Sequence, residues 1–148
     1  MPYSHLLVPI DGSSRSEQAL RHALQLAQAL GARITVLHVQ PHGPVVLPGL
    51  GDRLDAATLA SLMKAREAET QQILEVAAAI TAPSGVPTTC EQVTDELPHR
   101  AIVAEAQRLG CDLILMASHG RRGLSGLLLG SEAQRVLVQA PCPVLIYR

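Results

Sequence analysis

The chain has 148 residues, and its 12 Lys and Arg almost balance its 13 Asp and Glu, which gives a formal net charge of −1 at pH 7. Hydrophobic residues make up 47% of the chain, yet there is no Phe or Trp and only two Tyr. This composition argues against nucleic-acid binding, which uses basic surfaces and aromatic stacking, and no apolar run reaches the roughly 20 residues of a membrane span. Because the length suits one domain and the start has no signal-peptide pattern, we expect a single cytosolic domain, residues 1–148.

The N-terminal segment predicts a buried strand followed by a helix. Residues 6–10, Leu-Leu-Val-Pro-Ile, form a short apolar run that is typical of a buried strand. Ser14 and Glu17 have the spacing of a capping box, in which each side chain satisfies the backbone N–H of the other residue. Apolar residues then recur at helical spacing until Gly31, which predicts the end of the helix.

The middle of the chain predicts two strands separated by a loop and a helix. Residues 34–39 predict a second buried strand, and residues 41–52 are rich in Pro and Gly and predict a loop. Loops of this length in compact domains are usually functional or mobile. Residues 56–80 predict a second helix, and the alternating pattern of residues 88–93 predicts a strand at a sheet edge.

The C-terminal part predicts two more strands and two more helices. Pro98 suits the first turn of a helix that Gly110 ends. A strongly apolar strand follows at residues 112–117, then a glycine-rich loop and a short helix at residues 131–139. Residues 144–147 predict the last strand.

Strands and helices alternate along the whole chain, which predicts right-handed crossovers and a doubly wound parallel α/β sheet with helices on both faces. A core of Leu, Val, Ile and Ala suits strands that are buried on both sides. Such sheets bind ligands beyond the carboxyl ends of the strands, where the strand order reverses. The first strand is followed by residues 11–13 (Asp-Gly-Ser) and the fourth by residues 118–120 (Ser-His-Gly). These two strand ends are therefore the candidate binding site.

The loop after the fourth strand has the features of a phosphate site. Its glycines are Gly120, Gly123, Gly126 and Gly130. Glycine lets a backbone turn tightly and approach a ligand closely. Ser131 begins a helix whose free N–H groups and positive dipole end attract phosphate, and Arg121 and Arg122 add charge beside it. The alternative is a purely structural connection with solvated arginines.

Other familiar site motifs are absent from the sequence. Ser131 is not preceded by the Lys of a P-loop, and no GxGxxG follows the first predicted strand. The three cysteines, Cys90, Cys111 and Cys142, are odd in number and far apart, so they form neither a disulfide framework nor a CxxC metal site. We expect reduced cysteines with packing roles and six histidines that lie mostly on the surface.

Four segments together resemble the universal stress protein family. They are residues 8–13 (Val-Pro-Ile-Asp-Gly-Ser), the strand end His38-Val39, the loop at residues 116–131, and residues 140–146 (Ala-Pro-Cys-Pro-Val-Leu-Ile). The resemblance covers essentially the whole chain. It implies five strands in the order 3-2-1-4-5, with the switch point between strands one and four.

The nucleotide-binding branch of that family carries glycine, two residues, glycine, nine residues, glycine, and then Ser or Thr. Gly120, Gly130 and Ser131 match this pattern, whereas Ala117 stands in place of the first glycine. The methyl group of Ala117 is therefore a departure at a position where the family approaches the nucleotide.

The resemblance implies a site for ATP, or for ADP or AMP, with Mg²⁺. Its implied members are Pro9, Ile10 and Asp11 along the nucleoside, Val39 and Met116 against adenine, and Ala117, Gly120, Gly130, Ser131 and the backbone of Glu132 near the phosphates. Asp11 is also the implied residue beside a phosphate-bound metal.

Three functions are open at this stage. The first is a regulatory module that binds an adenine nucleotide and is not an enzyme, with any ATP turnover slow. The second is a hydrolase built from Asp11, His119 and Ser131, although the chain has no GxSxG motif. The third is a dimeric interaction protein without nucleotide. Residues 144–147 would form an apolar edge strand, so we predict a homodimer through this strand.

Overall fold

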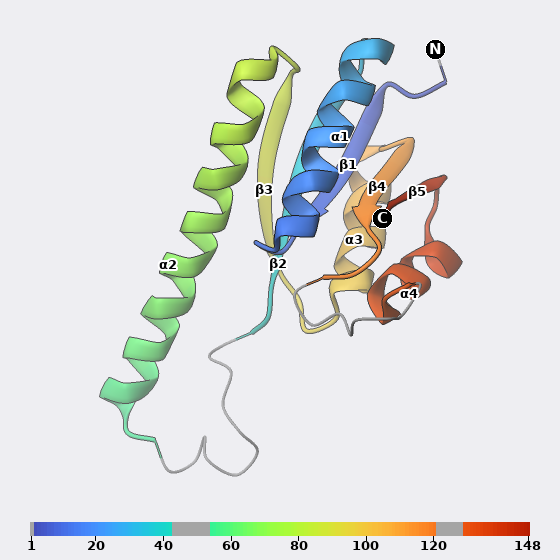
Figure 1. Ribbon diagram of the computed structural model, residues 1–148. Helices are drawn as coiled ribbons and strands as arrows, with labels where there is room; N and C mark the ends of the chain where they lie inside the picture. Colours follow the sequence, from blue (N-terminus) through green and yellow to red (C-terminus); the bar gives the residue numbers. More distant parts are fainter. Residues whose placement is uncertain (1, 43–53, 121–128) are drawn as a thin grey trace.

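The computed structural model describes residues 2–42, 54–120 and 129–148 of the chain. Its centre is one parallel sheet with the strand order β3-β2-β1-β4-β5, as predicted (Figure 1). The strands are β1 His5–Ile10, β2 Arg33–Gln40, β3 Thr88–Thr94, β4 Leu113–Ala117 and β5 Val144–Tyr147. β3 and β5 form the two edges, which confirms the edge position predicted for residues 88–93.

Helices cover both faces of the sheet, which confirms the doubly wound architecture. The helices are α1 Ser14–Leu30, α2 Ala56–Thr81 with a short 3₁₀ turn η2 Ala82–Ser84 after it, α3 Pro98–Leu109 and α4 Ser131–Gln139. α1 and α2 pack on one face, and α3 and α4 pack on the other (Figure 1). Of the predicted loop at residues 41–52, only its first two residues lie within the described part of the chain.

Alternate residues of the strands supply the two cores. Leu6, Val8 and Ile10 of β1 point into the core beneath α1 and α2, whereas Leu7 points into the core beneath α3 and α4. Leu6, Leu7 and Val8 are completely buried. Each such side chain contributes roughly 1.5–3 kcal/mol through removal from water. We call the residues buried beneath α1 and α2 the α1/α2-side core, and those buried beneath α3 and α4 the α3/α4-side core.

The cap of α1 differs by one residue from the prediction, whereas the start of α4 is confirmed. The N-cap of α1 is Ser13, whose hydroxyl accepts a bond from Ser16 N at 3.1 Å, so the predicted pairing of Ser14 with Glu17 is wrong. Asp11-Gly12-Ser13 turns the chain one residue earlier than the apolar pattern suggests. At α4 the N-cap is Gly130, and Ser131 is the first helical residue, as predicted.

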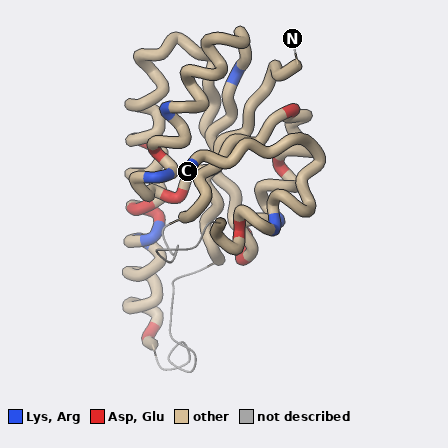
Figure 2. The backbone as a smooth tube through the Cα atoms, turned by 45° about the vertical axis from the view of Figure 1, so that its right-hand side comes forward, with Lys and Arg blue, Asp and Glu red and all other residues tan. Residues whose placement is uncertain are grey.

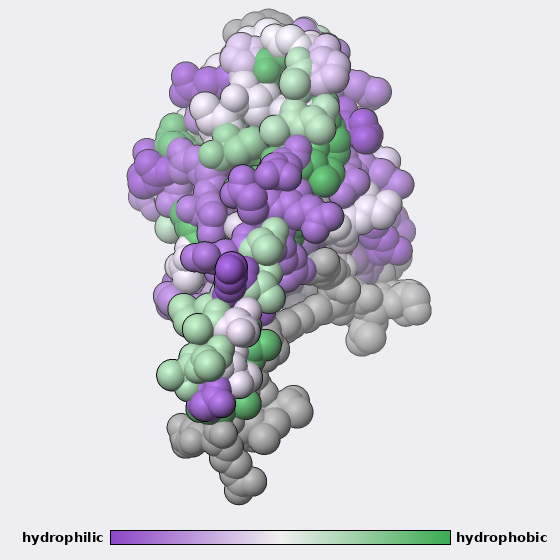
Figure 3. All heavy atoms as spheres, turned by 90° about the vertical axis from the view of Figure 1, so that its left-hand side faces the viewer, coloured by the Kyte–Doolittle hydropathy of each residue, from purple (hydrophilic) through white to green (hydrophobic). Residues whose placement is uncertain are grey.

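The first part of helix α2 extends well past the carboxyl ends of the strands (Figure 1). Its buried residues are Thr70, Ile73, Ala77 and Thr81, all in its second half. In its first half, residues 56–69, Leu62 and Met63 are exposed to solvent. Figure 3 looks onto this side of the molecule and shows apolar groups of α2 among hydrophilic ones.

Charged residues are mixed in sign over the described surface. Figure 2 shows basic and acidic positions intermingled along the helices, so the described residues form no basic stripe for a nucleic-acid backbone. None of the described helices has the length and apolar character that crossing a membrane requires.

Candidate functional site

The carboxyl ends of β1 and β4 lie at the point where the strand order reverses. β1 pairs with β2 at every one of its residues, but its pairing with β4 is limited to Leu6 and Leu7. Beyond Leu7, the two strands have no ladder between them. The sheet is therefore open between β1 and β4 on the side where ligands of doubly wound sheets bind.

Pro9 explains why this ladder stops. The Ser4 carbonyl accepts a bond from Arg33 N of β2, whereas the next carbonyl, that of His5, accepts one from Asp112 N beside β4, each at 3.0 Å. Alternate residues of β1 thus face opposite neighbours, and Pro9 faces β4. Because proline has no N–H, it cannot extend the ladder to β4. Pro9, which the resemblance placed in the site, therefore separates β1 from β4 at their carboxyl ends.

Asp11 follows β1 and is oriented by the start of α1. Its Oδ1 accepts a bond from Ser13 N at 3.0 Å, and its own N–H donates to Ser16 Oγ at 3.3 Å. Its Oδ2 points at Gly120, the second residue after Ser118, because a Cβ built on Gly120 would lie only 2.5 Å from that oxygen. The two predicted strand ends therefore meet, and glycine at position 120 leaves room for the carboxylate.

Gly130 brings the start of α4 against the end of β4. Its N–H donates to the Ser118 carbonyl at 2.7 Å, and a Cβ on Gly130 would lie 2.9 Å from that oxygen. The first intrahelical bond of α4 runs from Gln134 N to the Gly130 carbonyl at 3.0 Å. The N–H groups of Ser131, Glu132 and Ala133 therefore have no partner within the helix, which is the arrangement that attracts anions.

His119 lies beside this helix start, and its two ring nitrogens differ in their surroundings. The side chain is 6% exposed, and its Cδ2 lies 3.8 Å from the position of a Cβ on Gly130. Nδ1 is 3.1 Å from Ser118 Oγ, whereas Nε2 is buried without a hydrogen-bond partner in the described part of the chain. A buried polar atom without a partner costs about 1–3 kcal/mol, so it marks a position where a ligand group would be stabilised.

The apolar residues of the predicted site divide between the two faces of the sheet. Val39 and Met116 both contact the α3/α4-side core, at the carboxyl ends of β2 and β4. Ile10 and Ala117 belong instead to the α1/α2-side core, and Ala117 is only 8% exposed. The methyl group that distinguishes this chain from the family pattern is therefore packed in the core.

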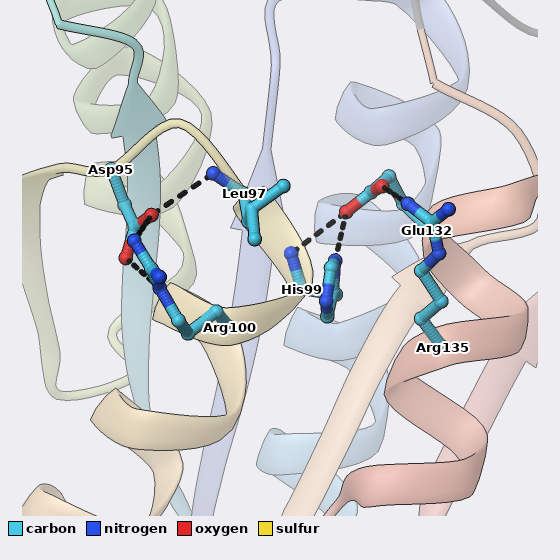
Figure 4. Close-up of polar contacts among 6 residues, drawn as sticks. All are labelled: Asp95, Leu97, His99, Arg100, Glu132 and Arg135. Atoms are coloured by element: carbon cyan, nitrogen blue, oxygen red, sulfur yellow. Dashed lines mark hydrogen bonds and ion pairs between the residues drawn. The ribbon is translucent and has the colours of Figure 1, made fainter.

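Glu132 has a structural partner that no sequence pattern indicated (Figure 4). Its Oε2 accepts bonds from His99 N at 2.8 Å and from His99 Nδ1 at 3.0 Å, and its Oε1 pairs with Arg135 at 3.0 Å. Nearby, Asp95 accepts a bidentate pair of bonds from Arg100, which holds the pKa of that carboxyl down to about 2. A separation of 33 residues leaves the His99–Glu132 pair without a local signal.

The histidines are more buried than the sequence suggested. The buried ones are His5, His38, His99 and His119. His5 contacts Thr35 Oγ1 at 2.8 Å, and burial, reinforced by Arg33, lowers the pKa of its imidazole. The expectation of mostly surface histidines was therefore wrong, because the buried imidazole rings have polar partners inside the protein. The three cysteines are free thiols, as expected.

Four residues of the predicted phosphate loop lie outside the described residues: Arg121, Arg122, Gly123 and Gly126. A second candidate site, elsewhere in the fold, is weaker. An open groove of about 490 Å³ lies between α1 and α2, lined by Arg21, Val76, Ala79, Ile80, Pro83 and Ser84. It is far from the strand ends and holds few convergent polar groups, so we do not favour it. Within the described ranges, no group of three His, Cys, Asp or Glu could hold a metal ion by itself.

The strand order and the opening between β1 and β4 place the chain in the class of doubly wound α/β proteins. The chain belongs to the universal stress protein family, whose family model matches residues 2–148. It is 32% identical to universal stress proteins of Methanocaldococcus jannaschii, covering 99% of this chain and 82% of the relative, and of Bacillus subtilis, covering 99% of both. The structure of UspA from Lactobacillus plantarum superposes with a TM-score of 0.82 at 25% identity, over 100% of this chain and 99% of that one.

More distant structures of the family contain adenine nucleotides. A universal stress protein from Archaeoglobus fulgidus in complex with dAMP has a TM-score of 0.68 at 24% identity, over the full length of both chains. A family member from Arabidopsis thaliana with AMP bound has a TM-score of 0.68 at 19% identity, over 97% of this chain and 90% of that one. At these sequence identities, the similarity shows a shared fold and no more than that.

Proposed function

We propose that this protein is a stress-response regulatory module that binds ATP or a related adenine nucleotide between the carboxyl ends of β1 and β4. The observation that carries the proposal is the buried His119 Nε2, which has no partner among the described residues, beside the N–H groups of α4 that have no partner within the helix. The opening of the sheet at Pro9 supports the same place. Family structures with AMP and dAMP support the adenine nucleotide as the ligand class.

The direct test is calorimetry of the purified protein with ATP, ADP and AMP, with and without magnesium. Mass spectrometry of any nucleotide that the denatured protein releases would identify the ligand that it carries from the cell. The proposal predicts saturable binding at millimolar nucleotide or below. Neither heat nor a thermal shift at that concentration would favour the alternative, an interaction protein without nucleotide.

Asp11 fits a metal that arrives with the phosphates rather than a preformed metal site. Mg²⁺ is commonly held by one or two carboxylates together with substrate phosphates. Asp11 is the carboxylate at the strand ends, and its Oδ1 is already engaged by Ser13 N. Bound Mg²⁺ would neutralise phosphate charge there. We therefore expect magnesium to strengthen ATP binding more than AMP binding, and the Asp11→Asn variant to lose that difference.

We also propose that the protein is not a dedicated ATPase. Fast phosphoryl transfer needs a positioned base or water-orienting residue, a metal clamp and cations at the transition state. His119 is the nearest candidate base, but its Nδ1 contacts Ser118 Oγ, and no carboxylate among the described residues is hydrogen-bonded to its ring. Steady-state phosphate release should stay well below about 1 s⁻¹. A faster rate that collapses in the His119→Ala variant would make the protein an enzyme.

We propose a homodimer that forms through β5. All four residues of this edge strand are only partly buried, and the neighbouring α4 exposes Leu137 and Val138, the latter at 86%. Antiparallel pairing of β5 with a second copy would satisfy the open edge by the simplest symmetry. Light scattering should give twice the chain mass at tens of micromolar, and a monomer there would contradict the proposal. We place the protein in the cytoplasm, where three free thiols are the normal state.

A further inference from the structure

The N-terminus of α3 is capped by a residue of another helix. Its N-cap residue, Leu97, has no side chain that can accept a hydrogen bond. The Glu132 carboxylate of α4 takes that role by accepting the bond from His99 N at 2.8 Å. A carboxylate at a helix N-terminus is also favoured by the helix dipole. The starts of α3 and α4 are thus joined by one side chain (Figure 4).

The side chain of His99 makes this junction rigid. It is 11% exposed, and its Nδ1 lies 3.0 Å from the same Glu132 oxygen. A carboxylate only accepts hydrogen bonds, so His99 Nδ1 must carry a proton. Arg135 holds the other oxygen of Glu132 at 3.0 Å. Charge-assisted bonds are about twice as strong as neutral ones, and three of them fix this carboxylate.

Glu132 is also the second residue of α4, the helix whose N-terminus forms part of the proposed phosphate site. Its backbone N–H is one of the three groups of α4 without an intrahelical partner, between Ser131 and Ala133. Fixing its side chain to α3 therefore fixes the rotation of the first turn of α4, and with it the direction of those N–H groups. Anion binding by backbone groups depends on this direction, because hydrogen bonds weaken steeply away from linearity.

We propose that His99 and Glu132 are positioning residues that aim the N-terminus of α4 at the phosphates of the bound nucleotide. This inference rests on the proposed function. It assigns His99 a role in affinity that acts through Glu132, although His99 belongs to a different helix. The role concerns only the phosphates, because the predicted adenine contacts Val39 and Met116 lie on strands β2 and β4 rather than on α4.

The test compares ligands with and without phosphate on two variants of one residue. His99→Leu removes the side-chain bond to Glu132 but keeps the backbone bond and the carboxylate. His99→Asn replaces the Nδ1 donor with an amide donor. We expect His99→Leu to weaken ATP and AMP about tenfold by calorimetry and to leave adenosine within twofold by NMR titration, which measures millimolar affinities. His99→Asn should restore ATP binding to within threefold of the unaltered protein.

A matched control removes another carboxylate contact of α3. Glu105→Gln breaks the pair with Arg108, whose Nε lies 2.9 Å from Glu105 Oε2, without touching α4, and should leave all three ligands unchanged. If His99→Leu is too unstable to titrate, Glu132→Gln should give the same split between ATP and adenosine. Equal weakening of both ligands, or of neither, would overturn the positioning role while leaving nucleotide binding intact. Absence of binding to the unaltered protein would overturn the proposed function itself.

Discussion

The contact between Gly130 and the end of β4 makes Gly130→Ala the most informative single change. The backbone of Gly130, at φ −69° and ψ 157°, is open to any residue, so the substitution introduces no backbone strain. Its new methyl group would lie 2.9 Å from the Ser118 carbonyl oxygen, about half an ångström closer than ordinary van der Waals contact. The main chain must therefore move, because neither partner is a flexible side chain.

The expected loss follows from that movement. Overpacking of this kind costs about 1–3 kcal/mol of stability. A similar displacement of the first turn of α4 would weaken its bonds to a phosphate, which contribute about 1.5–3 kcal/mol each when the acceptor is charged. Loss of half of one or two such bonds is about 1–2 kcal/mol, so ATP affinity should fall roughly tenfold.

Calorimetry with ATP, combined with urea unfolding, separates the two effects. Gly110→Ala is the matched control, because Gly110 has a φ of +65° with open space around it and lies at the opposite end of the sheet. It should lose about 1 kcal/mol of stability through backbone strain alone and keep its ATP affinity. Unchanged ATP binding in Gly130→Ala, or an equal loss in both variants, would refute the placement of the phosphate site.

Three further expectations concern other positions. Ala117→Gly should destabilise the protein by about 1–2 kcal/mol in urea unfolding and leave ATP affinity within twofold, because its methyl is in the core; a tenfold gain in affinity would contradict this. The pKa of His5 is lowered in the fold by burial and by Arg33, so the unfolded chain takes up the proton first, and stability should decline as pH falls below about 6.5. That decline should be smaller in His5→Gln, and an equal one would point to other groups. Iodoacetamide at pH 7.5 should modify the exposed Cys90 well before Cys111, whose burial raises the thiol pKa to about 11; equal rates, followed by mass spectrometry, would count against the packing of Cys111.

The sequence predicted the sheet well because its three central strands, β1, β2 and β4, are largely buried and two of its helices end at glycines. Gly31 and Gly110 end α1 and α3 as expected, each with its N–H bonded back to the helix. The pattern also picked the two strand ends that carry Asp11 and Gly120, whereas the strand order that puts the switch point between them came from the resemblance. What the pattern could not supply was how closely they approach: a Cβ built on Gly120 would lie 2.5 Å from Asp11 Oδ2.

Features that depend on contacts distant in sequence were not predictable in this way. The capping role of Glu132 for α3 requires two helices to meet, and the burial of His5 requires Thr35 from the neighbouring strand. Pro9 was identified as a site residue by resemblance, but its effect on the β1–β4 ladder depends on which neighbour its backbone faces. The error at Ser14 has a local cause, because adjacent serines offer two caps and the turn at Asp11 decides between them.

Helix α2 has an uneven distribution of local stability along its 26 residues. Its second half is attached to the sheet through Thr70, Ile73 and Ala77, whereas residues 56–69 contribute no buried side chain. Fewer than about 15 residues rarely sustain a helix in water without tertiary packing. Amide hydrogens of residues 56–69 should therefore exchange with solvent through local unwinding, and those after Thr70 only through opening of the core. The protein thus carries a helical segment whose order can be gained or lost while the sheet and its strand ends stay intact.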